Sequence, residues 1–243
     1  MLHRTEGLVL RSFPFGEADL IVTYLTPDMG ILRLFAKSPR KTRSRFGSSL
    51  EPLTHARISF WGKEHASLPK LTQSDIISSF QGIRDSMDHF FRVSEIVELT
   101  LHFLPERDSN DKAFALFLRT LHHFHEGTGE TLVLAHYKIK LLRYVGFAPK
   151  LDGCGRCGQK GNHFYIAHGT VLCEKCASGT DTPMRIPVAV SALYRDLLTW
   201  DISKIKRIKP SKKLLNELSG FLDIHIHYIL STPIKSKVLT CSR

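Results

Sequence analysis

The chain has 243 residues, of which 42% are hydrophobic and 23% charged, a composition typical of globular domains rather than of disordered or fibrous chains. No apolar run approaches the ~20 residues needed to cross a bilayer, so we expect no membrane partner and a cytoplasmic location. The net charge of +11 favours a polyanionic partner, nucleic acid first and acidic protein tails second. Lys and Arg outnumber Asp and Glu by 11 to 7 in residues 1–80 and by 11 to 4 in residues 185–243, so both ends are basic.

Residues 1–80 contain five short β-rich segments bounded by turn residues. The segments cover residues 5–13, 20–25, 31–36, 55–61 and 67–76. Residues 26–30 (TPDMG) predict a tight reversal between the second and third segments. Five strands with a long connection after the third predict a domain over residues 1–80 that folds as an OB-type β-barrel. An SH3-like barrel remains the alternative, because a count of strands does not distinguish the two.

The connection after the third segment is strongly basic. It carries no acid between Asp28 and Glu51. We expect it to contact nucleic-acid phosphates, although a solvated loop would have the same composition. Phe46 follows directly, and an aromatic ring beside cations on a barrel face is typical of base stacking. The predicted nucleic-acid-binding residues are Arg33, Lys37, Arg40, Lys41, Arg43, Arg45 and Phe46.

Beyond residue 80 the apolar spacing becomes helical, which predicts a helical domain over residues 81–243. One helix is expected over residues 86–104, a second from the capping cluster at 108–110 to Gly127, and a third over residues 131–145. The acids of the first helix lie opposite its apolar face, and we interpret them as a solvated stripe. These acids are Asp85, Asp88, Glu95 and Glu98.

The helix over residues 131–145 combines apolar residues with a basic stripe. His136, Lys140 and Arg143 follow one another at spacings of four and three, which places them on one face beside Tyr137 and Leu141. Such a stripe is either the solvated side of the helix or a surface for an acidic ligand that carries an apolar group.

Four cysteines occur as two C-x-x-C pairs, CGRC at Cys154 and Cys157 and CEKC at Cys173 and Cys176. The fifteen residues between the pairs match the spacing of a zinc ribbon, and four thiolates complete a tetrahedral shell. We therefore predict one structural zinc ion in a ribbon over residues 150–180, without a catalytic role.

Three other roles for these cysteines are possible. Two disulfides could join the same thiols, but we expect reduced cysteines because no signal-peptide pattern opens the chain. A redox C-x-x-C would need only one pair, in a βαβ setting that the sequence lacks. His163 or His168 could replace one cysteine as a ligand. Cys241 is interpreted as a thiol without a role.

Two further helices are predicted over residues 187–200 and 210–230, each beginning at a proline. A second basic cluster lies between them, and the sequence does not assign it a role. Its members are Lys204, Lys206, Arg207, Lys209, Lys212 and Lys213.

Three segments together resemble the bacterial recombination and repair mediator family RecO. The opening GLVLRSFPFGEADLIVTYLTPDMG is similar to that family's N-terminal signature, RKTRSRFGSSLEPL to its basic loop, and LRYVGFAPKLDGCGRCG to its helix exit into the zinc knuckle. The similarity extends over residues 1 to about 176, and this chain keeps all four cysteines.

The resemblance implies a non-enzymatic DNA-binding mediator in double-strand-break and gap repair. Such a protein binds ssDNA and dsDNA, anneals complementary strands and works with RecR to load RecA onto ssDNA coated by single-strand-binding protein (SSB). It implies an association with the nucleoid, no small-molecule substrate, and docking of the acidic SSB C-terminal tail. We expect that tail on His136, Lys140, Arg143, Tyr137 and Leu141. A zinc-containing metal-dependent nuclease and an RNA-binding OB-fold factor are the alternatives. A nuclease would need clustered carboxylates, of which no motif is evident.

Overall fold

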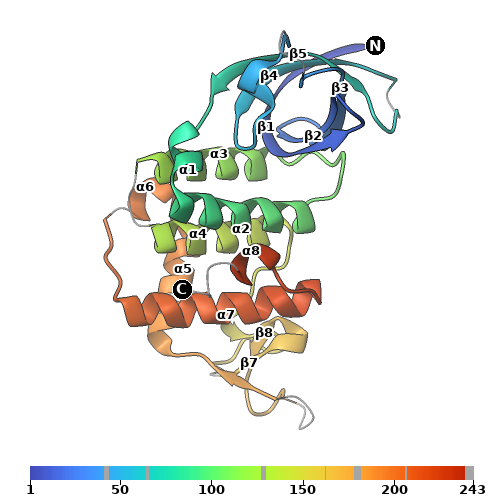
Figure 1. Cartoon of the computed structure of the whole chain (residues 1–243). Coiled ribbons are helices and arrows are strands. Elements are labelled where there is room, and N and C mark those ends of the chain that lie inside the picture. Colours follow the sequence, from blue (N-terminus) through green and yellow to red (C-terminus); the bar gives the residue numbers. More distant parts are fainter. Residues whose placement is uncertain are drawn as a thin grey trace. The chain divides into compact units, whose positions relative to one another are not determined.

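A computed structural model describes residues 1–40, 44–63, 66–126, 130–161, 163–177, 182–205 and 207–238 of the chain. The chain divides into two compact units, Met1–Glu126 and Gly127–Arg243. The boundary expected near residue 80 lies between the barrel strands and the helices of the first unit (Figure 1). Within the described ranges, no helix combines the length and the apolar content needed to cross a membrane.

The first unit begins with a closed β-barrel. Its strands are β1 (Leu2–Phe15), β2 (Asp19–Thr26), β3 (Gly30–Ala36), β4 (His55–Trp61) and β5 (Lys70–Ser78). They are ordered β1-β2-β3-β5-β4, with a parallel β3–β5 pair and antiparallel pairs elsewhere (Figure 1). A five-stranded barrel with this order is an OB-fold, as predicted, and the SH3-like alternative is excluded.

Strand β1 is long enough to pair with two strands, β4 along its first half and β2 along its second half. Its first half pairs with β4, beginning at Leu2 opposite Trp61, and its second half pairs with β2, ending at Phe15 opposite Asp19. A register shift between Val9 and Arg11 marks a bulge, which bends the strand between its two partners. The side chains that point inward form the barrel core. They include Val9, Val22, Tyr24, Leu34, Ile58 and Leu71, all with no exposed surface.

The reversal between β2 and β3 is the turn that the sequence predicts. Gly30 has φ +62°, a left-handed conformation that favours glycine. A Cβ at this position would lie 2.0 Å from the backbone oxygen of Asp108. Thr26 Oγ1 donates to the oxygen of Gly30 at 2.9 Å and accepts from the backbone N–H of Met29 at 3.1 Å. The glycine is therefore required both by the turn and by the segment that packs against it.

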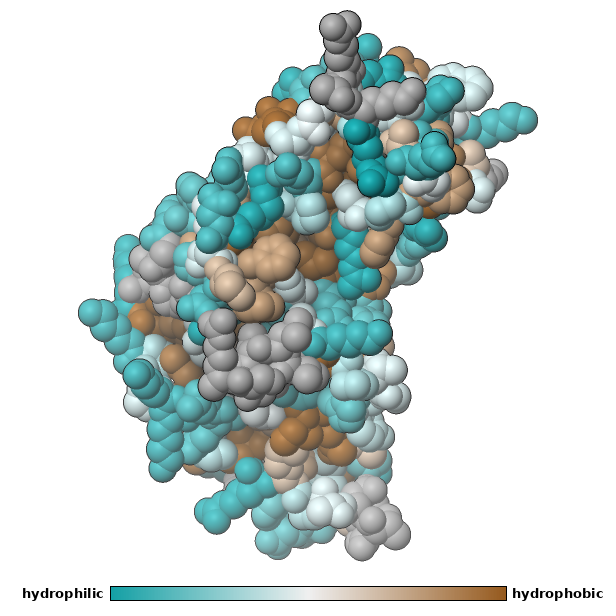
Figure 2. Space-filling model, viewed as in Figure 1, coloured by the Kyte–Doolittle hydropathy of each residue, from teal (hydrophilic) through white to brown (hydrophobic). Residues whose placement is uncertain are grey.

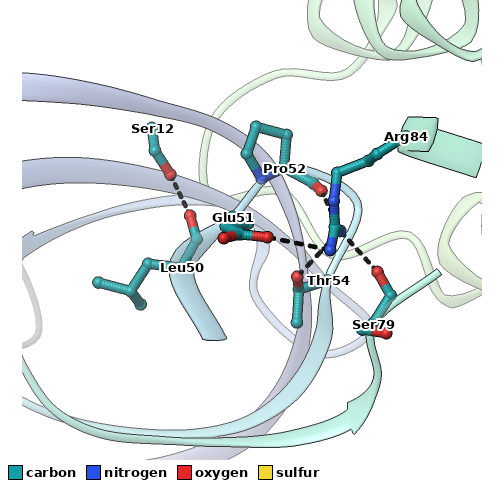
Figure 3. Close-up of polar contacts among 7 residues, drawn as sticks. All are labelled: Ser12, Leu50, Glu51, Pro52, Thr54, Ser79 and Arg84. Atoms are coloured by element: carbon teal, nitrogen blue, oxygen red, sulfur yellow. Dashed lines mark hydrogen bonds and ion pairs between the residues drawn. The ribbon is translucent and has the colours of Figure 1, made fainter. Parts of the chain in front are cut away.

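The segment before β4 is held by one arginine from α1 (Gln81–Asp85). The guanidinium of Arg84 donates to the backbone oxygens of Pro52 at 3.0 Å and Ser79 at 2.6 Å, and lies 3.0 Å from the Glu51 carboxylate (Figure 3). Upstream, Ser12 Oγ donates at 2.5 Å to the backbone oxygen of Leu50, the last residue of the short 3₁₀ helix Gly47–Leu50 (Figure 3). The end of the β3–β4 connection is thus fixed to both β1 and α1.

Two longer helices, α2 (Met87–Phe103) and α3 (Asp111–His125), complete the first unit. Their predicted starts are confirmed, because Ser86 and Asn110 cap them through side-chain oxygens that accept from backbone N–H groups three residues later. The prediction that the acids of α2 form a solvated stripe is wrong in part. Glu95 and Glu98 are buried, with 7% and 6% exposure, and Glu98 lies 3.9 Å from His102. Helical spacing alone did not reveal that this face is covered.

The second unit is built around α4 (Glu130–Tyr144). The other helices are α5 (Val188–Thr199), α6 (Ile202–Ile205), α7 (Lys212–Leu230) and α8 (Lys235–Val238). Helix α4 packs against α5 and α7, and the core includes fully buried Tyr137, Leu142, Leu197 and Leu218. Ser211 caps α7 by accepting from the N–H of Leu214, so this helix begins after Pro210.

A small sheet is inserted between α4 and α5, where the sequence predicts a ribbon. Its strands are β6 (Lys150–Cys154), β7 (His163–Tyr165), β8 (Thr170–Leu172) and β9 (Met184–Arg185), in the order β6-β8-β7-β9. Phe164 of β7 packs edge-on against Phe221 of α7, with ring centres 5.1 Å apart. The sheet therefore has its own contact with the helical core (Figure 1).

Candidate metal centre and nucleic-acid interface

The four cysteines of the two C-x-x-C pairs converge on one point. All four Sγ atoms lie within 4.8 Å of one another, and the Sγ atoms of Cys157 and Cys173 are 3.6 Å apart. Cys154 ends β6 and is buried, whereas Cys157 is exposed at the turn that follows. Four sulfurs at these separations can surround a single metal ion.

The glycines around the first pair allow the chain to fold tightly. Gly158 has φ +75°, which favours glycine, and its N–H donates to the oxygen of Cys154 at 2.8 Å. A Cβ on Gly155 would lie 2.6 Å from Thr170 of the neighbouring strand. At the second pair, the N–H of Cys176 donates to the oxygen of Cys173 at 3.0 Å. Both pairs are therefore short turns that direct their sulfurs inward, as predicted.

The thiols differ in acidity because their hydrogen bonds differ. Hydrogen bonding from the Cys173 backbone is the main cause that lowers the pKa of Cys154 to about 6. Hydrogen bonding with the Cys157 side chain is the main cause that raises the pKa of Cys176 to about 12. Among the described residues, the cluster consists of the four cysteines, and neither His163 nor His168 belongs to it. Cys241 lies outside the described residues.

The predicted nucleic-acid-binding cations are found at the surface where the structure describes them. Arg33 lies in β3 with a half-exposed side chain, and its guanidinium is 3.9 Å from exposed Glu106. Lys37, Arg40 and Arg45 are exposed, and the N–H of Arg40 donates to the oxygen of Ala18 at 3.3 Å. Lys41 and Arg43 lie outside the described residues.

Phe46 does not have the exposed position that base stacking requires. Its ring is 4% exposed and belongs to the barrel core, with the Arg45 guanidinium 4.9 Å from the ring centre. The stacking role predicted for Phe46 is therefore corrected to a packing role. The sequence could not separate these roles, because an aromatic residue next to a basic run has the same appearance in both.

Exposed aromatic rings occur instead on the outer face of β1, where the sequence analysis assigned no function. Phe13 and Phe15 are 53% and 52% exposed, and Arg11 precedes them on the same face. The alternation in RSFPF indicated this arrangement, since residues two apart on a strand share a face. Strand β3, which pairs with β2 and carries Arg33, leads directly into the basic connection. The basic connection therefore begins next to this outer face.

The basic stripe on α4 is not an open docking surface. His136, Tyr137, Lys140 and Leu141 are all buried, at 9% exposure or less, and only Arg143 is exposed. The three basic side chains instead contact the end of α5. His136 Nε2 lies 3.2 Å from the oxygen of Trp200, and Lys140 and Arg143 donate to the oxygen of Leu198 at 2.9 and 2.8 Å. The stripe serves internal packing because orphan carbonyls at a helix C-terminus need donors.

The chain is thus an OB-barrel followed by helices, with an inserted cluster of four cysteines that could hold one metal ion. Family models match this chain as Recombination protein O N terminal over residues 1–80 and Recombination protein O C terminal over residues 88–237. The DNA repair protein RecO of Thermodesulfovibrio yellowstonii is 41% identical over 236 residues, which cover 95% of this chain and 94% of the relative. That of Dehalococcoides mccartyi is 32% identical over 239 residues, 96% of this chain and 92% of the relative.

A third relative, the DNA repair protein RecO of Bacillus pumilus, is 29% identical over 98% of this chain and 93% of its own length. The chain belongs to the RecO family, as its sequence motifs indicated. This membership assigns it to DNA repair and recombination.

Proposed function

We propose that this protein is a DNA-binding recombination mediator. It binds single- and double-stranded DNA, anneals complementary strands and, together with RecR, helps to load RecA onto ssDNA coated by SSB. The observation that carries the proposal is the 41% identity to a DNA repair protein RecO over 95% of the chain. Exposed cations on and after β3 support it, because phosphate contacts of this kind bind DNA independently of sequence.

The proposed contacts to phosphates come from Arg33, Lys37, Arg40 and Arg45, and from Lys41 and Arg43 outside the described residues. Glu106 competes for Arg33 only weakly, since an exposed ion pair contributes about 0 to 1 kcal/mol. The acidic SSB tail remains a proposed partner, but its site is not on the buried α4 stripe. The protein is proposed to act at the nucleoid, where its DNA substrate is found.

The metal centre is proposed to hold one zinc ion with a structural role. Tetrahedral zinc with Zn–S bonds of about 2.3 Å holds its sulfurs about 3.8 Å apart. The 3.6 Å between the Sγ atoms of Cys157 and Cys173 is near this value, and all four Sγ atoms lie within 4.8 Å of one another. Four cysteine ligands leave no open position for a substrate or a water molecule, so the proposed role is to stabilise the ribbon and its contact with α7.

A strand-annealing assay tests the proposed function directly. Complementary oligonucleotides, one with a fluorophore and one with a quencher, are mixed with SSB and then with the protein. We expect annealing to be faster with the protein than without it. This acceleration should require neither ATP nor a divalent metal ion. Release of labelled nucleotides with Mg²⁺ or Mn²⁺ would instead favour a nuclease. Equal or tighter binding to RNA of the same sequence would favour an RNA-binding factor.

The proposed partners require a separate measurement. Purified RecR and an SSB tail peptide are titrated against the protein, and a peptide without its acidic residues is the control. We expect RecR and the intact tail to bind, the tail more weakly as salt rises. Failure of both to bind would contradict the mediator role while leaving DNA binding and annealing as the remaining activity.

A further inference from the structure

The four cysteines of the cluster differ in how well the fold covers them. Cys154 is buried, with 3% exposure, and belongs to the small apolar core of the ribbon. Cys173 and Cys176 are partly buried and pack against the same core. Cys157, in the turn after β6, is exposed. A reagent dissolved in water therefore reaches the sulfur of Cys157 first.

Cys157 has a neighbouring sulfur in the other C-x-x-C pair. Its Sγ atom lies 3.6 Å from the Sγ atom of Cys173, which directly follows β8. An S–S bond is about 2.05 Å long, so the two sulfurs need to approach by about 1.5 Å to become bonded. A small movement of the turn that carries Cys157 is enough to close this gap.

Contacts other than those of the sulfurs hold the two pairs side by side. Cys154 pairs with Val171 between β6 and β8, and the N–H of Gly155 donates to the oxygen of Val171 at 2.9 Å. Arg156 Nη1 donates to the backbone oxygen of Cys176 at 2.7 Å, which ties the first turn to the second. Because these contacts do not pass through a metal ion, the sulfurs can stay close together when the ion leaves.

The surface around Cys157 is rich in cations. Arg156, Lys160 and Lys175 are exposed in or next to the two turns, and Glu174 is the acid in the second turn. Over the ribbon, in the lower part of the view, hydrophilic side chains border hydrophobic surface (Figure 2). A cation beside a reacting sulfur stabilises the negative charge that develops on oxygen when the O–O bond of a peroxide breaks. Exposure and an adjacent second thiol are features of cysteines that sense oxidants.

We propose that the cysteine cluster is a redox switch, in which a peroxide converts Cys157 and Cys173 to a disulfide and the metal centre opens. This inference rests on the zinc ion proposed above and adds a modification that releases it. In the first step the Cys157 sulfur attacks hydrogen peroxide and the O–O bond breaks. One oxygen stays on the sulfur as a sulfenic acid, and the other leaves as hydroxide, which takes up a proton to become water.

The second step uses the neighbouring sulfur. Cys173 attacks the sulfur of Cys157, an S–S bond forms and the S–O bond breaks. The departing hydroxide takes up a second proton. Two thiolates, one hydrogen peroxide and two protons thus give one disulfide and two waters, and the two electrons lost by the sulfurs reduce the peroxide.

The disulfide removes two of the four ligands. Cys154 and Cys176 remain, and two thiolates do not complete the tetrahedral shell that holds zinc tightly. Since metal binding stabilises such modules, the contact of the ribbon with α7 through Phe164 and Phe221 should weaken. A cavity of about 600 Å³ already lies between part of the ribbon and α7, so few other contacts replace this one.

Peptide mapping of the full-length, zinc-loaded protein tests the proposed disulfide. Trypsin separates all four cysteines, because it cleaves after Arg156, Lys160 and Lys175. The four peptides are residues 151–156, 157–160, 161–175 and 176–185. After treatment with hydrogen peroxide and alkylation, we expect the first linked product to join 157–160 to 161–175. A first disulfide within either C-x-x-C pair would overturn the proposal.

Zinc release is followed in the same reaction with a chromogenic chelator. We expect one zinc ion to be released for each disulfide, together with a lower Tm. A thiol reductant with added zinc should restore both the bound zinc and the Tm. Zinc that stays bound while peroxide is consumed, or release with sulfinic acid at Cys157 and no disulfide, would overturn the switch. Protein that never binds zinc would instead contradict the metal centre itself.

A variant that keeps all four cysteines tests the setting of Cys157. Arg156→Gln removes the adjacent cation, and Arg156→Lys retains it. We expect the release caused by peroxide, measured above the release without it, to be about two- to fivefold slower in Arg156→Gln than in Arg156→Lys. Arg207→Gln, which removes another exposed arginine of the second unit, is the matched control and should react at the wild-type rate. Equal rates in all of these proteins would overturn the role of the cationic setting in the switch.

Discussion

Lys140 Nζ and Arg143 Nη1 donate to the same acceptor, the backbone oxygen of Leu198, at 2.9 and 2.8 Å. Leu198 lies in the last turn of α5, where backbone oxygens have no partner within the helix. Two cations at this end also interact favourably with the helix dipole. Burial, followed by the nearby charge of Arg143, lowers the pKa of Lys140. The pair thus joins α4 to α5 by a shared acceptor.

A shared acceptor predicts non-additive stability effects. We expect Lys140→Met and Arg143→Gln each to lower the free energy of unfolding by less than about 1.5 kcal/mol, because the remaining donor still satisfies Leu198. The double variant should lose more than the sum of the two, by about 0.5 kcal/mol or more. Urea denaturation of the four proteins measures the coupling. Strictly additive losses would show that the two hydrogen bonds act independently.

Removal of one cysteine ligand should affect folding rather than a chemical step. We expect Cys154→Ser to reduce bound zinc well below one ion per chain and to lower Tm, because metal binding contributes to the stability of such modules. Cys241→Ser is the control, since Cys241 belongs to neither C-x-x-C pair in the sequence. Elemental analysis and thermal denaturation are the measurements. Protein purified without chelator that contains no metal would contradict the proposed centre.

Arg84 is expected to stabilise the barrel through the connection that it holds (Figure 3). Arg84→Met removes hydrogen bonds from a charged donor to two backbone oxygens, which should cost about 1.5 to 3 kcal/mol of unfolding free energy. Glu51→Gln should cost much less, because the carboxylate of Glu51 is 53% exposed and its ion pair is screened by solvent. Equal losses in urea denaturation would mean that the ion pair, rather than the backbone contacts, provides the stability.

Two glycines with similar backbone angles should tolerate substitution differently. Gly30 and Gly47 have φ +62° and +51°, so alanine at either position costs roughly 1 to 2 kcal/mol of strain. A Cβ at Gly47 meets nothing within 4 Å, whereas at Gly30 it lies 2.0 Å from the Asp108 oxygen. We expect Gly47→Ala to fold with a modestly reduced Tm and Gly30→Ala to be far less stable. Similar Tm values for the two variants would contradict the close contact at Asp108.

Acid should destabilise the protein in part through His225. Burial is the main cause that lowers its pKa, despite the 2.9 Å contact between Nε2 and the oxygen of Phe147. The unfolded chain, with a pKa of about 6.5, therefore takes up a proton first, so stability is present above that pH and is lost as the pH falls below it. His225 faces Phe164, Phe221 and Phe147, which supply no charge.

His225→Gln retains an amide that can donate to Phe147 but cannot titrate. We expect the unfolding free energy of this variant to fall less between pH 7 and pH 5.5 than that of the wild type. Urea denaturation at the two pH values measures the difference. Burial also lowers the pKa of His55. Because His55 is present in both proteins, its contribution to the pH dependence cancels from the comparison. A parallel fall in both proteins would exclude a contribution from His225.

The sequence predicted helix starts and turns well, because a single residue type at one position determines each of these features. Ser86, Asn110 and Gly30 act within a few residues, so their caps and turn follow from residue type and spacing. The cysteine cluster was predictable for the same reason. The barrel order, by contrast, depends on pairings such as that of Phe35 with Lys70, which no local pattern encodes.

The errors in the predicted sites share one physical cause. Phe46, Lys140 and Glu98 were interpreted from charge and polarity, but their burial depends on which distant segments cover them. A basic stripe on a helix has the same spacing whether it faces solvent or the end of another helix. The exposure of Phe13 and Phe15 was likewise not predictable, because strand alternation gives two faces without stating which one is covered.

The length of β1 also has a consequence for the order of folding. Its first residue pairs with Trp61, so the barrel closes only after most of the first eighty residues have been made, and such distant pairings form slowly. The cysteine cluster closes a loop less than half as long, which costs less chain entropy. A barrel that remains open during synthesis exposes the unpaired backbone of β1 and β3, and this interval is when the growing chain is most prone to aggregate.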